Sequence, residues 1–212
     1  MASTEDSVFQ HRHRAYSFVC ICAISVLWVL SVLSAVGFGP GSAAAYYVTV
    51  KVIRKEQGKL LPEFWASFRE NWRNGLVLGL GALLLAALLV FLIQFSSSVS
   101  EQGQGWVVLS YVYFLLLLML GCFCMFLFPA FSRFRMGMWH GLKFSCAITI
   151  LHLLTALTCL LVWYLAYRII RYLPIMIVVL PGTCMLICSY IVEPILRGFT
   201  KKTSETDAWY LE

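Results

Sequence analysis

The sequence predicts an all-helical protein with several membrane-spanning helices, and two observations carry that prediction. Of the 212 residues, 61% are hydrophobic and only 12% are charged, whereas roughly a quarter of the residues in an ordinary soluble domain are charged. Apolar runs of about 20 residues, the length that crosses a bilayer as a helix, alternate with short polar stretches. The predicted fold class is therefore an all-α, polytopic transmembrane helical bundle of five or six membrane segments.

The first apolar run extends from about Tyr16 to Phe38 without a charged residue. It is longer than the roughly 7 to 15 apolar residues of a signal peptide, so we expect a retained membrane helix. Gly39-Pro40-Gly41 predicts a tight turn, because glycine adopts unusual dihedrals and proline starts turns. A second helix then runs from Ser42 to Ile53. Even extended to Gln57 it reaches only about 24 Å, so it must thin the bilayer or be partly buried in protein.

Leu60 to Trp72 predicts an amphipathic helix that lies in the plane of the lipid headgroups. Its apolar residues fall on one arc at 100° per residue and face away from its charged residues. The apolar arc consists of Leu60, Leu61, Phe64, Trp65, Phe68 and Trp72. Six basic residues between Lys51 and Arg73 place this part of the chain on the cytoplasmic side by the positive-inside rule.

Four further membrane segments are predicted after the amphipathic helix. Charge in the connecting loops predicts a cytoplasmic N-terminal segment (1–15), a membrane domain (16–199) and a cytoplasmic tail (200–212). An outside N-terminus with five segments is the alternative, because the second segment is short. The further segments are Gly75–Phe95, Trp106–Phe131, Phe144–Tyr167 and Leu173–Leu196.

The cysteines and the charges exclude several classes of function. All eight cysteines fall inside apolar runs, where a free cysteine packs as a small hydrophobic residue. Cys20-x-Cys22 and Cys122-x-Cys124 have no partner pair at zinc-site spacing, so neither a metal nor another cofactor is expected. The net charge of +6 is a topology signal in a membrane protein and does not indicate nucleic acid. Since no enzyme motif is found, we expect no enzymatic activity.

Four stretches of the chain together resemble the YesL family of bacterial membrane proteins. They occur in the family's order between about residue 25 and residue 199. The stretches are Gly37-Phe38-Gly39-Pro40-Gly41-Ser42-Ala43-Ala44-Ala45-Tyr46-Tyr47 followed by Lys51 to Lys55, Phe64-Trp65-x-x-Phe68-x-x-Asn71-Trp72, Phe128-Pro129-x-x-x-Arg133-Phe134, and Ser189-Tyr190-Ile191. Where the family tends to carry an acidic or polar residue after the Arg-Phe pair, this chain has Arg135-Met136, so the resemblance implies that a loop ion pair of the relatives is absent here.

The resemblance implies a location and a role. Family members lie in the cytoplasmic membrane and have no established biochemical activity, and they often accompany carbohydrate ABC importers. We therefore expect a multi-pass protein of the bacterial cytoplasmic membrane that is a non-enzymatic accessory or scaffold. Its partners would be membrane lipid and ABC importer permease subunits. The small-residue face at Ser42, Ala45 and Tyr46 and the aromatic face of Phe64, Trp65, Phe68 and Trp72 are the predicted partner surfaces.

A small stand-alone transporter or channel is the alternative function. His152 lies near the middle of its predicted span, and ionisable residues inside a membrane are functional candidates. The break at Gly39, Pro40 and Gly41 would line the same path, because irregular backbone at membrane depth needs a cavity or surrounding protein. The simpler interpretations are a turn at the glycines and a neutral His152 hydrogen-bonded inside the bundle. Glu193, four residues before Arg197, is predicted to form a helical ion pair.

Overall fold

The computed structural model describes residues 2–99, 104–134 and 137–200, and the side chains of residues 16–99, 105–134 and 137–199. Within these ranges the chain is helical and contains no strand, which confirms the all-α prediction. Arg135 and Met136, the side chains of residues 1–15 and the tail from residue 200 lie outside the described side chains, and so do the predictions that fall on them. The helices are α1 (Ala2–Leu33), α2 (Phe38–Val48), the π-helix η1 (Thr49–Arg54), α3 (Leu60–Glu70), α4 (Trp72–Ser98), α5 (Gln104–Arg133), α6 (Met138–Leu151), α7 (Leu153–Tyr172), the 3-10 helix η3 (Pro174–Val178) and α8 (Leu180–Thr200).

Five of the described helices are long and apolar enough to cross a membrane. They lie in α1, α4, α5, α7 and α8, and in each of them fewer than half of the residues are buried inside the protein. The five segments are Tyr16–Leu33, Trp72–Ser98, Gly105–Arg133, Leu153–Tyr172 and Leu180–Phe199. An exposed apolar helix is unstable in water and stable in hydrocarbon, so this arrangement is that of a multi-pass membrane protein.

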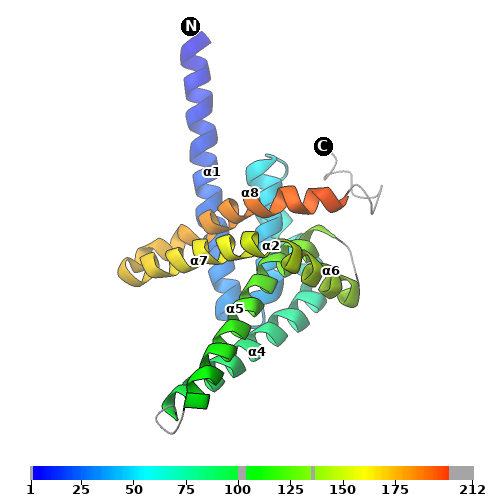
Figure 1. Ribbon diagram of the computed structural model, residues 1–212. Helices are drawn as coiled ribbons and strands as arrows, with labels where there is room; N and C mark the ends of the chain where they lie inside the picture. The colour runs from blue at the N-terminus through cyan, green and yellow to red at the C-terminus, as the bar shows by residue number, and fades with distance from the viewer. Residues whose placement is uncertain (1, 100–103, 135–136, 201–212) are drawn as a thin grey trace.

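Two helical hairpins and α1 surround a central short helix. α4 and α5 pack side by side along their lengths, and α7 packs beside α8 (Figure 1). The N-terminal part of α1 extends away from the remainder of the molecule (Figure 1). Short α2 contacts α1, α3, α4, α5 and α8, so five helices meet on it.

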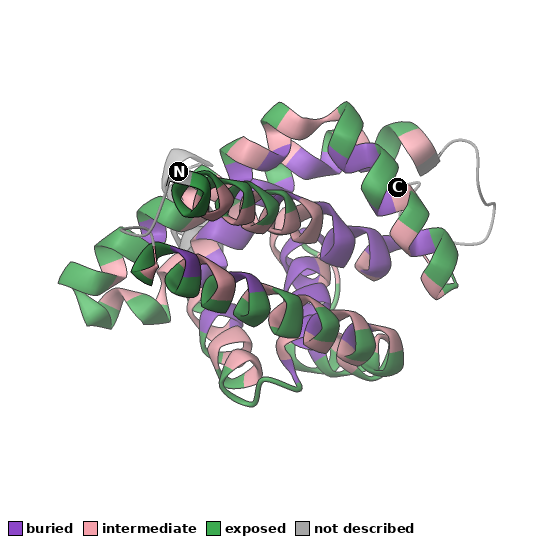
Figure 2. Ribbon diagram, turned by 60° about the horizontal axis from the view of Figure 1, so that its bottom comes forward, coloured by how far each residue is buried: buried purple, intermediate pink, exposed green. Residues whose placement is uncertain are grey.

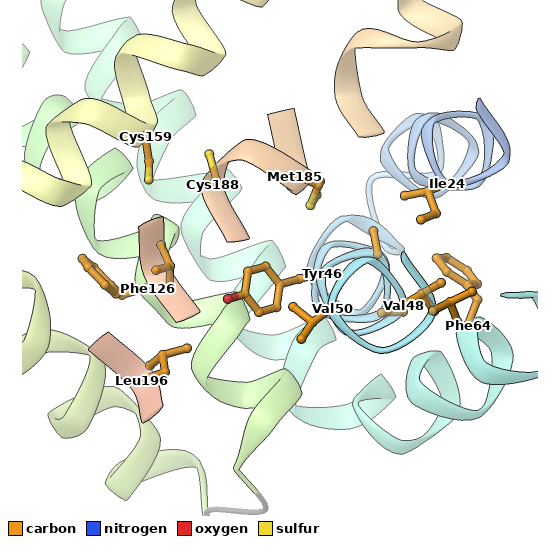
Figure 3. Close-up of a cluster of buried hydrophobic side chains, with 14 of the residues drawn as sticks. Ile24, Tyr46, Val48, Val50, Phe64, Phe126, Cys159, Met185, Cys188 and Leu196 are labelled. Atoms are coloured by element: carbon orange, nitrogen blue, oxygen red, sulfur yellow. The ribbon is translucent and has the colours of Figure 1, made fainter. Parts of the chain in front are cut away.

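The second predicted segment is buried in protein. Nine of the eleven residues of α2 are buried, and the chain continues into η1 with Thr49, Val50 and Val52 buried as well. Buried residues gather in the middle of the molecule and exposed ones on its outer faces (Figure 2). Tyr46 points from α2 to one side and Phe64 of α3 packs on the other (Figure 3). The helix is therefore a core element, and its short length needs no thinning of the bilayer.

The predicted turn at Gly39-Pro40-Gly41 is wrong, because the chain turns earlier. Residues 34–37 form the turn, where Ala35 has a positive φ of 53° and the Gly37 N–H donates a hydrogen bond to the Ser34 hydroxyl. Pro40 then lies in the first turn of α2, where its missing N–H costs no helical hydrogen bond.

After α2 and η1, helix α3 returns the chain to the level at which α1 ends. Trp72, at the start of α4, lines the same groove as Ser34 and Gly37 at the end of α1. Gly75 of α4 also lies against Gly39 and Pro40 at the start of α2. α2 and α3 therefore form a hairpin that starts and ends at one level. The chain does not cross the membrane between α1 and α4, which agrees with the alternative of five membrane segments.

The fold also differs from the prediction around His152. The predicted continuous span from Phe144 to Tyr167 is interrupted at His152, whose φ of −121° and ψ of 42° are not helical. Backbone hydrogen bonds continue on both sides, from His152 N–H to the Ile148 carbonyl and from Ala156 N–H to the His152 carbonyl. The interruption is therefore a kink, and the spanning helix α7 begins after it.

Candidate functional site

A buried ion pair between Arg133 and Glu193 lies at the centre of the molecule. Arg133 ends α5 and Glu193 lies within α8, and their side chains are only 2% and 3% exposed. The guanidinium donates a hydrogen bond to one carboxylate oxygen of Glu193, and the Tyr46 hydroxyl donates to the other at 3.4 Å. Side chains from α2, α5 and α8 thus meet at one carboxylate. A buried carboxylate needs such partners, because its desolvation is costly.

The predicted pair between Glu193 and Arg197 is confirmed, although it is the weaker of the two. The Arg197 Nε lies 3.4 Å from the carboxylate, and its side chain is half exposed. Pro194 does not interrupt α8 between the two residues. The stronger partner of Glu193 is Arg133, which lies 60 residues away in the sequence.

A second basic residue ties η1 to α8. Arg54 donates a hydrogen bond of 2.7 Å to the carbonyl oxygen of Ser189, and its guanidinium lies 4.3 Å from the centre of the Tyr190 ring. The Ser189 hydroxyl bonds back to the carbonyl of Leu186 within α8. The contact brings together two of the stretches on which the family resemblance rests.

A third cluster joins the end of α2 to α3. Lys51 donates hydrogen bonds to Glu63 at 2.9 Å and to the Tyr47 hydroxyl at 3.0 Å. Burial opposes the charge on Lys51, but the hydrogen bonds to Glu63 and Tyr47 outweigh it and raise the pKa of the lysine. A cation whose pKa is raised stabilises the fold at neutral pH and loses that contribution as the pH rises through its pKa. The cluster therefore fixes α3 against α2 under ordinary conditions.

An apolar cavity of about 270 Å³ adjoins the central ion pair. Tyr46 lines it at the side of Glu193, and Ser42 lies one turn earlier on α2. The Trp28 indole N–H donates a hydrogen bond of 3.0 Å to the Ser42 hydroxyl oxygen. Helices α1, α2, α5, α7 and α8 all contribute to the wall, so the cavity is a property of the tertiary fold.

The predicted small-residue surface is not a surface in the folded chain. Ser42, Ala45 and Tyr46 are buried, because five helices cover α2. These residues therefore serve contacts within the chain, and a partner has no access to them.

The predicted aromatic face is divided between core and surface. Phe64 is 4% exposed and belongs to the central core, and Phe68 packs against that core. Trp65 is 54% exposed and Trp72 is also exposed, so these two remain open to lipid or to a partner. The difference follows from α3 lying against α2, where one side of its wide apolar arc is covered.

The glycines and His152 of the predicted intramembrane site lie apart. A Cβ atom on Gly39 would overlap the carbonyl oxygen of Gly75, and one on Gly79 would lie 2.7 Å from the Cα of Gly39. Gly39, Pro40 and Gly41 are thus buried at a helix crossing. His152 is half-buried at the junction of α6 and α7. No hydrogen bond among the described residues joins His152 to this crossing.

Sequence reasoning missed two features that carried a signal. Gly75-x-x-x-Gly79 has the spacing of a close helix crossing. Arg133 and Glu193 are opposite charges at the end of one apolar run and inside another, and such charges usually pair when they are buried. Spacing along one helix indicates local contacts alone, so it predicted only the pair of Glu193 with its neighbour Arg197.

Comparison with known proteins gives one match. Residues 21–93 match the model of a family described as "Protein of unknown function, DUF624". The matched region extends from α1 into α4 and contains α2, η1 and α3. No curated protein and no solved structure is similar to the chain.

Proposed function

We propose that this protein is a non-enzymatic accessory or scaffold of the YesL family, which packs against a partner complex in the bacterial cytoplasmic membrane. The DUF624 match supports the family, since it contains two of the four stretches on which the resemblance rests. The resemblance also implies the partner, which is a carbohydrate ABC importer and in particular its permease subunits.

The exposed edge of α3 is the observation that carries this proposal. Leu61 and Trp65 expose large apolar side chains on α3, which is not one of the five membrane-spanning candidates, and Trp72 is exposed at the start of α4. Arg69 and Arg73 are exposed beside them, and neither forms an ion pair within the described part of the chain. Exposed tryptophan and arginine are the residues that most often dominate binding at protein interfaces.

The interior favours a fixed scaffold over a path for solutes. Glu193 is bonded to two arginines and a tyrosine, and its contacts with Arg133 and Tyr46 join α8 to α5 and to α2. The stand-alone transporter depends on His152 and the Gly39 break lining one path, and these lie at different junctions of the fold.

The proposal is tested by co-purification from native membranes in mild detergent. We expect importer permease subunits in stoichiometric amounts with the wild type, and at least a fivefold lower recovery with Trp65→Ala/Trp72→Ala. Trp139→Ala is the matched control, because Trp139 is exposed on α6, away from this edge. Phe64 is left intact, because truncating a core residue would lower the folding stability itself.

Two results would contradict the accessory role. One is recovery of the protein alone or as a homo-oligomer. The other is solute movement into vesicles that contain only this protein and that is lost in His152→Ala, which would favour the transporter.

A further inference from the structure

The central cavity is large, and side chains enclose it only in part. Protein interiors contain few voids larger than a water molecule, and this one measures about 270 Å³. Apolar cavities of roughly 150 Å³ in soluble proteins stay dry and bind benzene. If nothing occupied the cavity, the side chains that line it would lack packing partners on the side that faces it.

The wall of the cavity is rich in aromatic rings. Trp28 of α1 and Trp163 of α7 lie with ring centroids 5.0 Å apart, and Phe38 of α2 lies 5.3 Å from Phe128 of α5. With Tyr46, five rings line the space. Aromatic side chains pack best against other rings, which they meet edge-on or in offset stacks.

One hydrogen-bond donor in this wall is unused. The Ser42 hydroxyl oxygen accepts the Trp28 indole N–H, but its own proton has no acceptor among the described residues. Ser42 is only 5% exposed, so solvent does not satisfy it. The Trp28 bond also fixes the hydroxyl in place, so that its proton can serve an acceptor inside the cavity.

We propose that this cavity binds a small, uncharged, ring-bearing molecule that carries one carbonyl oxygen. The rings of the wall hold its apolar body, and the Ser42 hydroxyl donates a hydrogen bond to the carbonyl. A charged ligand is disfavoured, because no residue that lines the cavity is charged and the adjoining Glu193 is already paired with arginines. The cavity is smaller than the roughly 300 to 1,000 Å³ of sites for drug-sized ligands, so the ligand has one or two rings.

The test compares two probes that differ at one ring carbon, 1-indanone with a carbonyl group there and indane with a methylene group. Binding is measured on the full-length protein in detergent, from the rise in the thermal unfolding midpoint with probe concentration. We expect both probes to raise the midpoint, with an apparent affinity about fivefold higher for 1-indanone, the equivalent of one neutral hydrogen bond. Ser42→Ala should remove this preference and leave indane binding unchanged.

A cavity-filling variant locates the site. Cys188 lines the cavity, so Cys188→Leu should abolish the response to both probes. Cys146→Leu is the matched control, because Cys146 is exposed on α6, and this variant should respond as the wild type does. If Cys188→Leu does not fold, the comparison of Ser42→Ala with the wild type is sufficient to test the proposed site.

Three outcomes would overturn the proposal. They are the absence of any response in the wild type, equal responses of Cys188→Leu and the wild type, and equal affinities of the wild type for the two probes. A phospholipid that survives delipidation and that 1-indanone does not displace would assign the cavity to a lipid tail instead.

Discussion

α2 and α3 are neighbours of equal length, eleven residues each, but the fold uses them in opposite ways. α2 is covered on all sides by other helices, whereas α3 buries one side and leaves Leu61 and Trp65 exposed. The cause is side-chain size. From Gly39 to Ala45 α2 carries mainly glycine, serine and alanine, which let helix backbones approach closely, whereas α3 carries large rings on a wide arc, of which only the side of Phe64 is buried.

The comparison shows that a short helix in a membrane protein has its place set by its neighbours. α2 has the composition of a membrane segment, but it lies in the core of the protein. α3 has the pattern of an interfacial helix, and the ion pair of its Glu63 with Lys51 of η1 fixes its orientation. Changes to α2 should therefore act on stability, and changes to the outer side of α3 on binding.

The largest effect is expected at the crossing of α2 and α4. Gly39→Ala places a Cβ atom into the Gly75 backbone, which cannot move without shifting a helix. We expect a loss of about 3 kcal/mol or more in the free energy of unfolding, or no folded protein. Denaturant unfolding in detergent measures it. Gly81→Ala is the control, because no atom lies within 4 Å of its added Cβ, and it should leave stability unchanged or slightly raised.

The central ion pair should give the next largest effect. Glu193→Leu leaves the buried Arg133 without its carboxylate, and we expect a loss of about 3 to 5 kcal/mol. The double variant Arg133→Met/Glu193→Leu removes both charges and should recover most of that stability. A double variant that is no more stable than Glu193→Leu alone would contradict the pairing.

The smallest effect separates the two sides of α3. Phe64→Ala should lower the free energy of unfolding by about 3 kcal/mol, because it leaves a cavity in the core. Trp65→Ala, on the exposed side of the same helix, should change it by no more than about 0.5 kcal/mol. Unfolding of both variants in the same detergent makes the comparison. A loss for Trp65→Ala as large as that for Phe64→Ala would place both rings in the core.

Composition alone determined the class of this protein. Long uncharged runs such as Gly75–Phe95 can satisfy their backbone hydrogen bonds in hydrocarbon only as helices, so an all-α membrane bundle followed from the sequence. The length of the second segment also indicated that it is too short to span the bilayer unaided. The ion pair between Glu193 and Arg197 followed from spacing, because residues four apart share a helix face.

Only the tertiary structure decided which of these residues meet. Arg133, Glu193 and Tyr46 come from three helices, and no periodicity relates positions on different elements. The same holds for the cavity beside them, whose wall draws on five helices. An amphipathic pattern likewise identifies an apolar arc, but which part of the arc is covered depends on the neighbouring helix. That is why Phe64 and Trp65, adjacent in sequence, lie one in the core and one at the surface.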